Sequence, residues 1–377
     1  MLRKAAGSIW IPLLCVAGLL VAVAGAGLSY RGYRQHLASD LLAIHSPSGV
    51  QEGAFVRLGG IEQWVQIRGE DRNNPVLLFV HGGPGASTLP LSSSWLPWER
   101  YFTIVQWDQR GAGRTYGANT EAIAPTMTLE RMTLDGIELA EHLRTRLHKD
   151  KIILVGHSWG SFLGVSIVKQ RPDLFYAYVG TGQVVGRATF EKSFEITIAH
   201  LRALAQAANN TAALAELTPI ASQPAMNGEN RLVAEKWSKA LALPSADRLE
   251  PAGPIPPLFM PDFSLLDWYN WNGGIAFSAK YLRGRDGPMF KRDLASLGFE
   301  FPIPAFFIEG DGDDVTPSGP AEQYFERLIA PHKEFVLVRG GDHFIPFDRP
   351  DRFLAELVAR VRPFADPPNP APAPSLE

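Results

Sequence analysis

The sequence predicts an α/β fold, in which a mostly parallel central sheet is flanked by helices, carries an inserted helical cap and follows a transmembrane segment. Three observations support this prediction. Short apolar runs alternate with runs of helical periodicity over residues 51–185 and 301–365. Residues 186–300 interrupt that alternation with helix-like runs and a proline-rich stretch. Residues 9–28 form a continuous apolar run near the N-terminus.

The N-terminal apolar run has about the 20 residues that a helix needs to cross a bilayer. Residues 5–30 carry no charged side chain, and basic residues flank them on both sides. We predict that residues 1–30 form a single-pass membrane anchor. The alternative is a signal segment that is cleaved after small residues such as Ala24 or Ala26. The first prediction gives a membrane-anchored protein, and the second gives an exported or periplasmic one.

The predicted core follows a linker at residues 31–50 and comes in two parts. The first part covers residues 51–185, and the second covers residues 301–365, after the cap of residues 186–300. Closely spaced prolines then predict a disordered tail over residues 366–377. The apolar runs that predict strands are residues 54–58, 61–68, 76–80, 102–107, 152–155, 176–180, 304–309 and 334–338.

A glycine-rich turn between a predicted strand and a predicted helix carries the first candidate catalytic residue. The sequence G-H-S-W-G at residues 156–160 follows the apolar run 152–155 and precedes the helix-like run 161–170. A G-x-S-x-G sequence in this context is typical of a nucleophile elbow, a tight turn that exposes the serine hydroxyl. Ser158 is therefore the candidate nucleophile.

A serine hydroxyl needs a base and an orienting acid to act as a nucleophile at neutral pH. His343 lies in a glycine-rich loop just after a predicted strand, and catalytic groups of open α/β sheets lie at the carboxyl ends of strands. We predict that His343 is the base. Three carboxylates follow the preceding predicted strand and compete for the role of the acid, namely Asp311, Asp313 and Asp314.

Acyl transfer also requires hydrogen-bond donors for the negative charge that develops on the substrate oxygen. In this kind of site, one donor is the backbone N–H of the residue after the nucleophile, which is Trp159. The second donor is expected from the H-G-G-P-G loop that follows the predicted strand at residues 76–80. Gly83 is the predicted second donor, because glycine lets the backbone approach a substrate closely.

Together these motifs resemble the α/β-hydrolase superfamily and, within it, the proline iminopeptidase-like group of serine aminopeptidases. The resemblance is carried by H-G-G-P-G at residues 81–85, W-D-Q-R-G-A-G-R at 107–114, G-H-S-W-G-S at 156–161 and G-D-H at 341–343. It implies an α/β-hydrolase fold and hydrolysis by a Ser–Asp–His triad.

The resemblance also implies roles for single residues. The family's acid lies between a strand-terminal glycine and a proline, which favours Asp313, with Asp311 and Asp314 as alternatives. In the D-Q-R-G element, Asp108 and Arg110 are expected to hold the loop through paired charges and to be structural rather than catalytic.

Substrate specificity is expected in the cap. Trp268, Tyr269 and Trp271 are expected to line an apolar pocket for an acyl or prolyl group, and packing of the cap onto the core is the alternative role for them. Peptidases of the resembling group bind the free amino group of the substrate with cap glutamates, and their motif is incomplete here. Glu191, Glu195 and Glu235 lie in the predicted cap as possible replacements, and Glu191 and Glu195 are the candidates that we favour.

The composition argues against several other functions. The chain has 377 residues, of which 46% are hydrophobic, and a formal net charge of −3, which fits a large enzyme domain and not a nucleic-acid surface. The single cysteine, Cys15, excludes an internal disulfide and a metal site built from cysteines. No H-E-x-x-H sequence is present, so we predict no metal and no cofactor.

The sequence therefore predicts a serine hydrolase that acts on a peptide or small-molecule substrate through an acyl-enzyme. The first hypothesis is an aminopeptidase that releases an N-terminal residue such as proline. The second is a carboxylesterase or amidase that acts on small neutral acyl substrates. The third is a non-catalytic binding protein on a hydrolase scaffold, which a complete triad disfavours.

Overall fold

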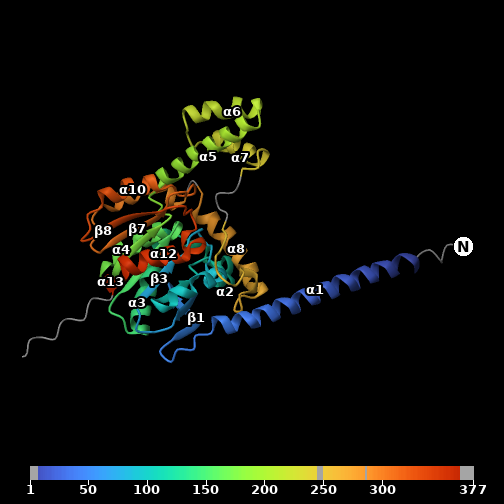
Figure 1. The fold of residues 1–377 in the computed structure, drawn as a ribbon, viewed down its shortest axis with the longest axis horizontal. Helices are drawn as coiled ribbons and strands as arrows, with labels where there is room; N and C mark the ends of the chain where they lie inside the picture. Colours follow the sequence, from blue (N-terminus) through green and yellow to red (C-terminus); the bar gives the residue numbers. More distant parts are fainter. Residues whose placement is uncertain (1–6, 244–248, 285–286, 366–377) are drawn as a thin grey trace, which may run out of the picture.

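A mixed β-sheet forms the centre of the protein (Figure 1). Its strands are β1 (Val50–Leu58), β2 (Ile61–Gly69), β3 (Val76–Val80), β4 (Thr103–Trp107), β5 (Ile152–His157), β6 (Phe175–Thr181), β7 (Ala305–Gly310) and β8 (Lys333–Val338). The computed structural model describes residues 7–243, 249–284 and 287–365, and within them the eight strands lie in the order β1-β2-β4-β3-β5-β6-β7-β8. β2 is antiparallel to β1 and β4, whereas the neighbours from β4 to β8 are parallel.

Helices cover both faces of this sheet. Successive residues of a strand point to opposite faces. Leu77 and Phe79 of β3 therefore pack against η1, α11 and α12, whereas Leu78 and Val80 pack against α3 and α4 on the other face. Burial of both faces explains why the run 76–80 is apolar throughout.

The helices outside the segment between β6 and β7 are η1 (Leu89–Arg100), α2 (Gly113–Asn119), η2 (Thr120–Thr126), α3 (Leu129–Leu147), α4 (Trp159–Gln170), η3 (Pro172–Leu174), α10 (Ser318–Arg327), α11 (Ile345–Asp348), α12 (Pro350–Glu356), η6 (Leu357–Val361) and α13 (Arg362–Ala365), together with the N-terminal helix α1 (Gly7–Leu42).

The chain leaves the sheet after β6 and returns to it at β7. The helices between these strands are α5 (Arg187–Ala207), α6 (Thr211–Ser222), α7 (Gly228–Ala240), η4 (Pro257–Phe259), α8 (Leu265–Leu282), α9 (Pro288–Lys291) and η5 (Leu294–Leu297). α5, α6 and α7 share an apolar cluster of their own, which includes Ile198, Leu217 and Trp237. Figure 1 shows these three helices projecting from the rest of the protein, whereas α8 lies against α2 beside the sheet. We call residues 186–300 the cap segment.

The N-terminal helix α1 is longer than the predicted anchor. It includes an 18-residue window with a mean hydropathy of 2.1, and it is long and apolar enough to cross a membrane. Its last turns lie against the segment around Phe263, where Ala38 and Leu42 are buried. The linker predicted at residues 31–50 is therefore helical as far as Leu42, because the body of the protein offers these residues apolar partners.

The fold class predicted from the sequence is confirmed. The sheet is mostly parallel and flanked by helices, and an N-terminal apolar helix is a candidate membrane segment. β1 begins at Val50, four residues before the predicted strand, because the whole of this edge strand pairs with β2. The tail predicted to be disordered, residues 366–377, lies outside the described residues.

Candidate active site

Ser158 lies in a sharp turn between β5 and α4. Its backbone has φ 56° and ψ −123°, a conformation that a residue other than glycine adopts only under constraint. Gly160 allows the turn, because a Cβ atom at this position would lie 1.9 Å from the carbonyl oxygen of Val80. Ser158 is half-buried, whereas the residues on either side of it are buried. The turn therefore presents the serine at the carboxyl end of β5.

Loops at the carboxyl ends of β7 and β8 bring Asp313 and His343 together. His343 Nδ1 lies 2.9 Å from Asp313 Oδ2, and both side chains are almost completely buried. Thr316 also fixes the carboxylate, since its backbone N–H donates to Oδ1 at 2.7 Å and its hydroxyl donates to Oδ2 at 2.7 Å. The carboxylate is thus oriented toward the imidazole before any substrate binds.

The other two candidate acids have different partners. Asp311 Oδ1 accepts a hydrogen bond from the backbone N–H of Gly340 at 2.8 Å. Asp314 Oδ2 lies 3.6 Å from Nδ1 of His200 on α5. Among the contacts described for these three carboxylates, the hydrogen bond to His343 belongs to Asp313.

Asp313 and Glu309 are both buried, but their pKa values are shifted in opposite directions. Burial alone would raise the pKa of Asp313, but the charge and hydrogen bond of His343 and the hydrogen bonds from Thr316 outweigh it and lower that pKa to about 2. Burial and the neighbouring charge of Asp313 instead raise the pKa of Glu309 well above its usual range. Asp313 is therefore ionised at neutral pH, whereas burial makes Glu309 hold its proton to a higher pH than a free glutamate does.

The loop after β3 passes directly against the nucleophile. A Cβ atom at Gly82 would lie 2.9 Å from Cβ of Ser158, so the backbone at this point is as close to the serine as packing allows. Gly83 follows with φ 114°, and the Gly83-Pro84 peptide bond is cis. Trp159, the other predicted oxyanion donor, is the first residue of α4.

Gln109 joins the two loops that carry the predicted oxyanion donors. Its side-chain amide donates to the carbonyl oxygen of His81 at 2.8 Å, and its side-chain oxygen accepts a hydrogen bond from Trp159 Nε1 at 3.0 Å. All three residues are buried. The glutamine of the D-Q-R-G element therefore ties the loop after β3 to the first turn of α4.

His157 supports the His343 loop rather than facing the substrate. Its Nε2 donates to the backbone carbonyl oxygen of His343 at 2.8 Å, and the two rings lie 4.8 Å apart. Burial and the adjacent His343 lower the pKa of His157 to about 3, so its ring is neutral at physiological pH. This contact fastens the loop of the candidate base to the residue that immediately precedes Ser158.

Asp108 and Arg110 of the D-Q-R-G element hold two different neighbours. Arg110 forms its ion pair with Asp135 of α3, through hydrogen bonds of 2.7 and 3.0 Å between fully buried side chains. Asp108 Oδ2 instead accepts the backbone N–H of Arg114 at 2.7 Å, at the start of α2. The element is structural, as expected, but Arg110 and Asp108 hold two different neighbours because their side chains leave the loop in different directions.

The three aromatic residues proposed to line a substrate pocket have different environments. Trp271 Nε1 donates to the carbonyl oxygen of Ser87 at 2.9 Å, just after the H-G-G-P-G loop. Trp268 packs edge-on against Trp271 and Phe263. Tyr269 is 75% exposed on the outer side of α8. Trp271 therefore joins the cap segment to the core, which is the alternative role that the sequence offers, whereas these contacts of Trp268 lie within the cap segment. A substrate pocket lined by these aromatic residues stays a prediction.

The two candidate amine-binding glutamates lie on α5 and are both engaged in ion pairs. Glu191 pairs with Arg187 at 2.7 Å, and Glu195 pairs with Lys192 at 2.8 Å. All four side chains are largely exposed. Each carboxylate already has a cation from its own helix.

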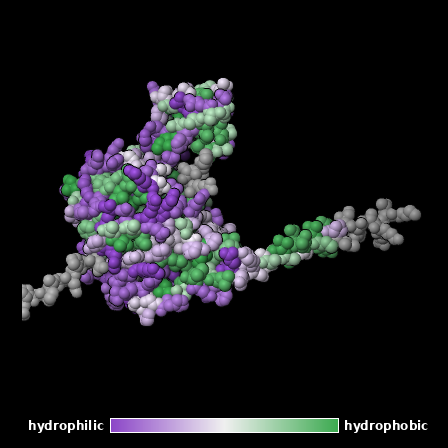
Figure 2. Space-filling view, viewed as in Figure 1, coloured by the Kyte–Doolittle hydropathy of each residue, from purple (hydrophilic) through white to green (hydrophobic). Residues whose placement is uncertain are grey.

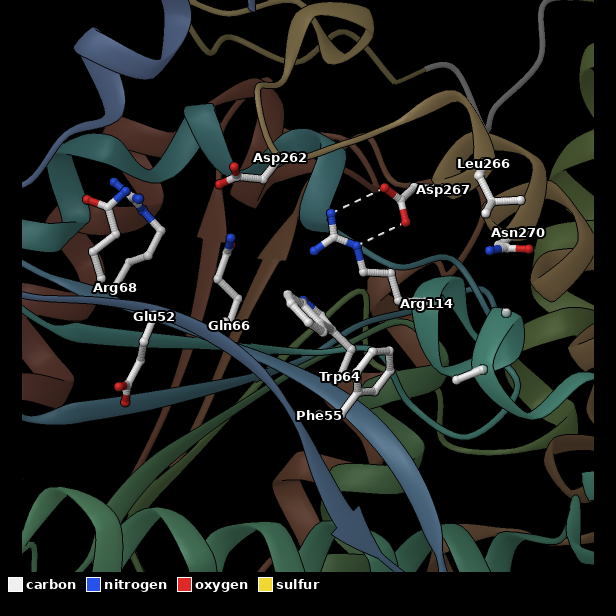
Figure 3. Close-up of a pocket in the computed structure, with 14 residues that line it drawn as sticks. Glu52, Phe55, Trp64, Gln66, Arg68, Arg114, Asp262, Leu266, Asp267 and Asn270 are labelled. Carbon is white, nitrogen blue, oxygen red and sulfur yellow. Dashed lines mark hydrogen bonds and ion pairs between the residues drawn. The ribbon is translucent and has the colours of Figure 1, made fainter.

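A groove of about 810 Å³ opens between the β1–β2 hairpin and the start of α8 (Figure 3). Figure 3 shows Arg114 between Trp64 and Asp267, with hydrogen bonds from its guanidinium to the Asp267 carboxylate. The guanidinium lies 4.4 Å from the centre of the Trp64 ring. None of the described residues that line this groove is a member of the candidate triad.

Sequence reasoning missed three polar residues beside the triad. Thr316 lies three positions after the candidate acid, where its hydrogen-bonding side chain was a usable signal. Gln109 is the polar residue of the D-Q-R-G element that the sequence reasoning left without a role. Glu309 is the next-to-last residue of β7, a strand with no other polar side chain, and a single ionisable residue in such a run is itself a signal. No group of three or more His, Cys, Asp or Glu that could hold a metal is found among the described residues.

The comparison with protein families settles the broader identity. The model of the alpha/beta hydrolase family matches residues 77–356. The chain belongs to this family. A curated relative from Bacillus subtilis, called "Probable aminopeptidase YbaC", is 28% identical over 309 residues, which are 81% of this chain and 94% of that protein. The probable proline iminopeptidase of Leptolyngbya boryana is 34% identical over 102 residues, which are 27% of this chain and 29% of that protein. The protein is therefore a hydrolase.

Solved structures show the same fold. The proline iminopeptidase of Mycobacterium smegmatis superposes with a TM-score of 0.58 at 17% identity and covers 84% of this chain and 99% of its own. A bacterial membrane phospholipase A superposes with a TM-score of 0.56 at 16% identity and covers 97% of this chain and 98% of its own.

Proposed function

We propose that the protein is a serine hydrolase that works through an acyl-enzyme on Ser158. The observation that carries this proposal is the buried Asp313–His343 pair. The residue before Ser158, His157, holds the His343 loop through a hydrogen bond to the His343 carbonyl. Ser158 Oγ attacks the substrate carbonyl carbon while His343 takes the hydroxyl proton. The backbone N–H groups of Gly83 and Trp159 hold the resulting oxyanion.

The second half of the reaction returns the enzyme to its starting state. The tetrahedral adduct collapses, the bond to the leaving group breaks, and His343 gives its proton to that group. Water then attacks the acyl-Ser158 ester and passes a proton to His343. The acid product leaves, and the proton returns to Ser158 Oγ. Asp313 stays ionised throughout and stabilises the imidazolium, a role that fits its pKa of about 2.

We further propose that the substrate is a peptide from which the enzyme removes an N-terminal residue, with proline as the first candidate. This specificity is supported by the relatives named as an aminopeptidase and a proline iminopeptidase. Such an enzyme needs a carboxylate for the free amino group of the substrate. Glu191 and Glu195 are the candidates, and each would have to exchange its present cation for the substrate.

The second candidate function is that of a carboxylesterase or amidase for small neutral acyl substrates. The position of Glu191 and Glu195 favours it, because the groove at α5 that both carboxylates line includes no residue of the candidate triad among the described residues. Both functions use the same triad and differ in whether a free amine is required.

The helix α1 is proposed to be a single-pass membrane anchor. Its apolar window, which is long enough to cross a bilayer, supports this. In this proposal the hydrolase body lies close to the bilayer surface, on the side to which the C-terminal end of α1 projects.

The experiment that separates the two functions uses the full chain in lipid nanodiscs. We would compare kcat/KM for a prolyl arylamide, the same compound with its amine acylated, and a short-chain aryl ester. The Ser158→Ala variant is the blank. A strong preference for the free amine supports the aminopeptidase. Equal rates with the acylated compound, together with fast ester cleavage, contradict it and support the esterase.

A further inference from the structure

The C-terminal part of α1 is fixed to the cap segment by polar contacts. The guanidinium of Arg31 donates to the backbone carbonyl oxygens of Leu258 and Phe263. One turn later, the amide of Gln35 donates to the carbonyl oxygens of Met260 at 2.7 Å and Phe263 at 3.2 Å. Two side chains of one helix thus hold the carbonyls of one short segment, so the direction of α1 relative to this segment is set.

These contacts also set the height of the cap segment above a bilayer that α1 would cross. The apolar run of α1 ends at Leu28, and Arg31 is its first charged residue. Three residues of helix span about 4.5 Å along the axis. Gln35 lies seven residues beyond Leu28 and shares the Phe263 carbonyl with Arg31, so the carbonyls of this segment lie about one to two helical turns from the end of the hydrocarbon-compatible stretch, at the depth of lipid headgroups.

The same part of the cap segment exposes a group of large apolar side chains. We call this group the cap edge; it consists of Leu258, Leu265, Leu266 and Tyr269, with 51%, 53%, 65% and 75% of their surface exposed. Figure 1 shows the start of α8 beside α1 where α1 leaves the body, and Figure 2 shows apolar side chains gathered at that corner. Apolar side chains grouped in this way on a soluble surface mark a site of interaction.

The adjoining surface of α1 has the composition of a membrane interface. Tyr30 and Tyr33 are both more than half exposed, and Tyr30 stacks edge-on against Phe259 of η4. The guanidinium of Arg34 lies 4.7 Å from the centre of the Phe259 ring. Tyrosine rings and basic side chains gather at the headgroup level of membrane proteins, where one end of the residue meets apolar chains and the other meets water.

We propose that the cap edge is a lipid-binding surface, which inserts into the headgroup and upper acyl region of the bilayer that α1 crosses. The inference rests on the proposed membrane anchor and goes beyond it, because an anchored body could equally stand clear of the lipid. Phospholipid is the occupant favoured by the contacts of Arg31, which place the cap edge next to the end of the apolar run. Apolar residues of interfacial elements are buried about 5–10 Å into this region.

The test measures lipid contact at single positions of the full chain in phosphatidylcholine and phosphatidylglycerol nanodiscs. Cys15 is the single cysteine of the chain, so a Cys15→Ser background accepts one new thiol. An environment-sensitive fluorophore is attached at Leu266→Cys in the cap edge, at Leu19→Cys in the apolar run, or at Leu337→Cys on β8. All three native side chains are exposed, so the label does not need to enter a core. Emission is then compared with and without lipids that carry a nitroxide near the headgroup and, separately, lipids that carry it near the end of an acyl chain, because Leu19 lies about half-way along the apolar run.

The expected result is that the Leu266→Cys label shifts to shorter wavelength and loses roughly half of its emission to the nitroxide lipid, as a depth of about 5–10 Å requires. The Leu337→Cys label should do neither. Quenching at Leu19→Cys with none at Leu266→Cys would overturn the lipid-binding surface and leave the anchor in place. A blue-shifted Leu266→Cys label without quenching would also overturn it, by indicating contact with a second copy of the chain. No quenching at Leu19→Cys would refute the anchor itself and the surface with it.

Discussion

Replacement of His157 by glutamine should make folding of this protein less sensitive to mild acid. The imidazole of His157 is buried and has a pKa of about 3, and burial likewise lowers the pKa of His81 to about 4, although the bond to the Gly82 carbonyl opposes this shift. Both histidines regain a pKa of about 6.5 when the chain unfolds. Between these pKa values and pH 6.5 the unfolded chain binds protons that the folded chain does not. The stability contributed by each neutral ring is therefore complete above pH 6.5 and is lost as the pH falls toward the folded pKa.

The magnitude follows from the shifts. A pH of 5 lies about 1.5 units below the pKa of His157 in the unfolded chain. This difference corresponds to a loss of about 2 kcal/mol of unfolding free energy. Glu309 acts in the opposite sense, because its raised pKa keeps a proton in the folded state that the unfolded state releases above about pH 4.5. The wild-type curve contains all of these groups, but the difference between wild type and His157→Gln isolates His157. Glutamine can still donate to the carbonyl oxygen of His343, so the loop keeps its contact.

The assay is urea unfolding of the full chain in nanodiscs at several pH values from 7.5 to 5, followed by tryptophan fluorescence. Between these limits, wild type should lose about 2 kcal/mol more than His157→Gln. Parallel losses in the two proteins would mean that His157 is protonated in the folded state, and the assignment of a neutral, structural ring would be refuted.

Three further substitutions test the geometry of the site. Asp313→Asn should lower kcat/KM by roughly 10⁴-fold by removing the charge that orients the base, whereas Asp311→Asn should change it less than about tenfold; equal losses would reassign the acid. Gly82→Ala should lower kcat by roughly 100-fold, because the new Cβ atom would press on the nucleophile at 2.9 Å, and a control Gly319→Ala, with no atom within 4 Å, should leave kcat unchanged. Gln109→Ala should lower kcat by about tenfold with KM nearly unchanged, since it unties the two oxyanion loops; a change confined to KM would assign Gln109 to substrate binding instead.

The fold was predictable because local sequence and tertiary structure agree in the core. The runs at 76–80 and 152–155 are apolar at every position, and such strands occur where helices cover both faces of a parallel sheet. The elbow was equally predictable, since a tight strand-to-helix turn leaves no room for a side chain at its glycines. In the structure, a Cβ atom at Gly160 would clash with the backbone of Val80.

The remaining features depend on contacts between distant segments, which composition does not encode. α1 extends beyond the predicted anchor because Arg31 and Gln35 find carbonyls more than 220 residues away in the sequence. Arg110 finds its ion-pair partner in Asp135 of α3, 25 residues further along the chain. Trp271 serves cap packing and reaches Ser87, a contact that no periodicity in the cap segment indicates.

The identity of the nucleophile is the central claim, and covalent labelling tests it most directly. The full chain in nanodiscs would be treated with a fluorophosphonate, digested, and mapped by mass spectrometry, with Ser158→Ala treated in parallel. We predict one adduct, on the peptide that contains Ser158, and no adduct in the variant. An adduct on another serine, or equal labelling of Ser158→Ala, would contradict the account.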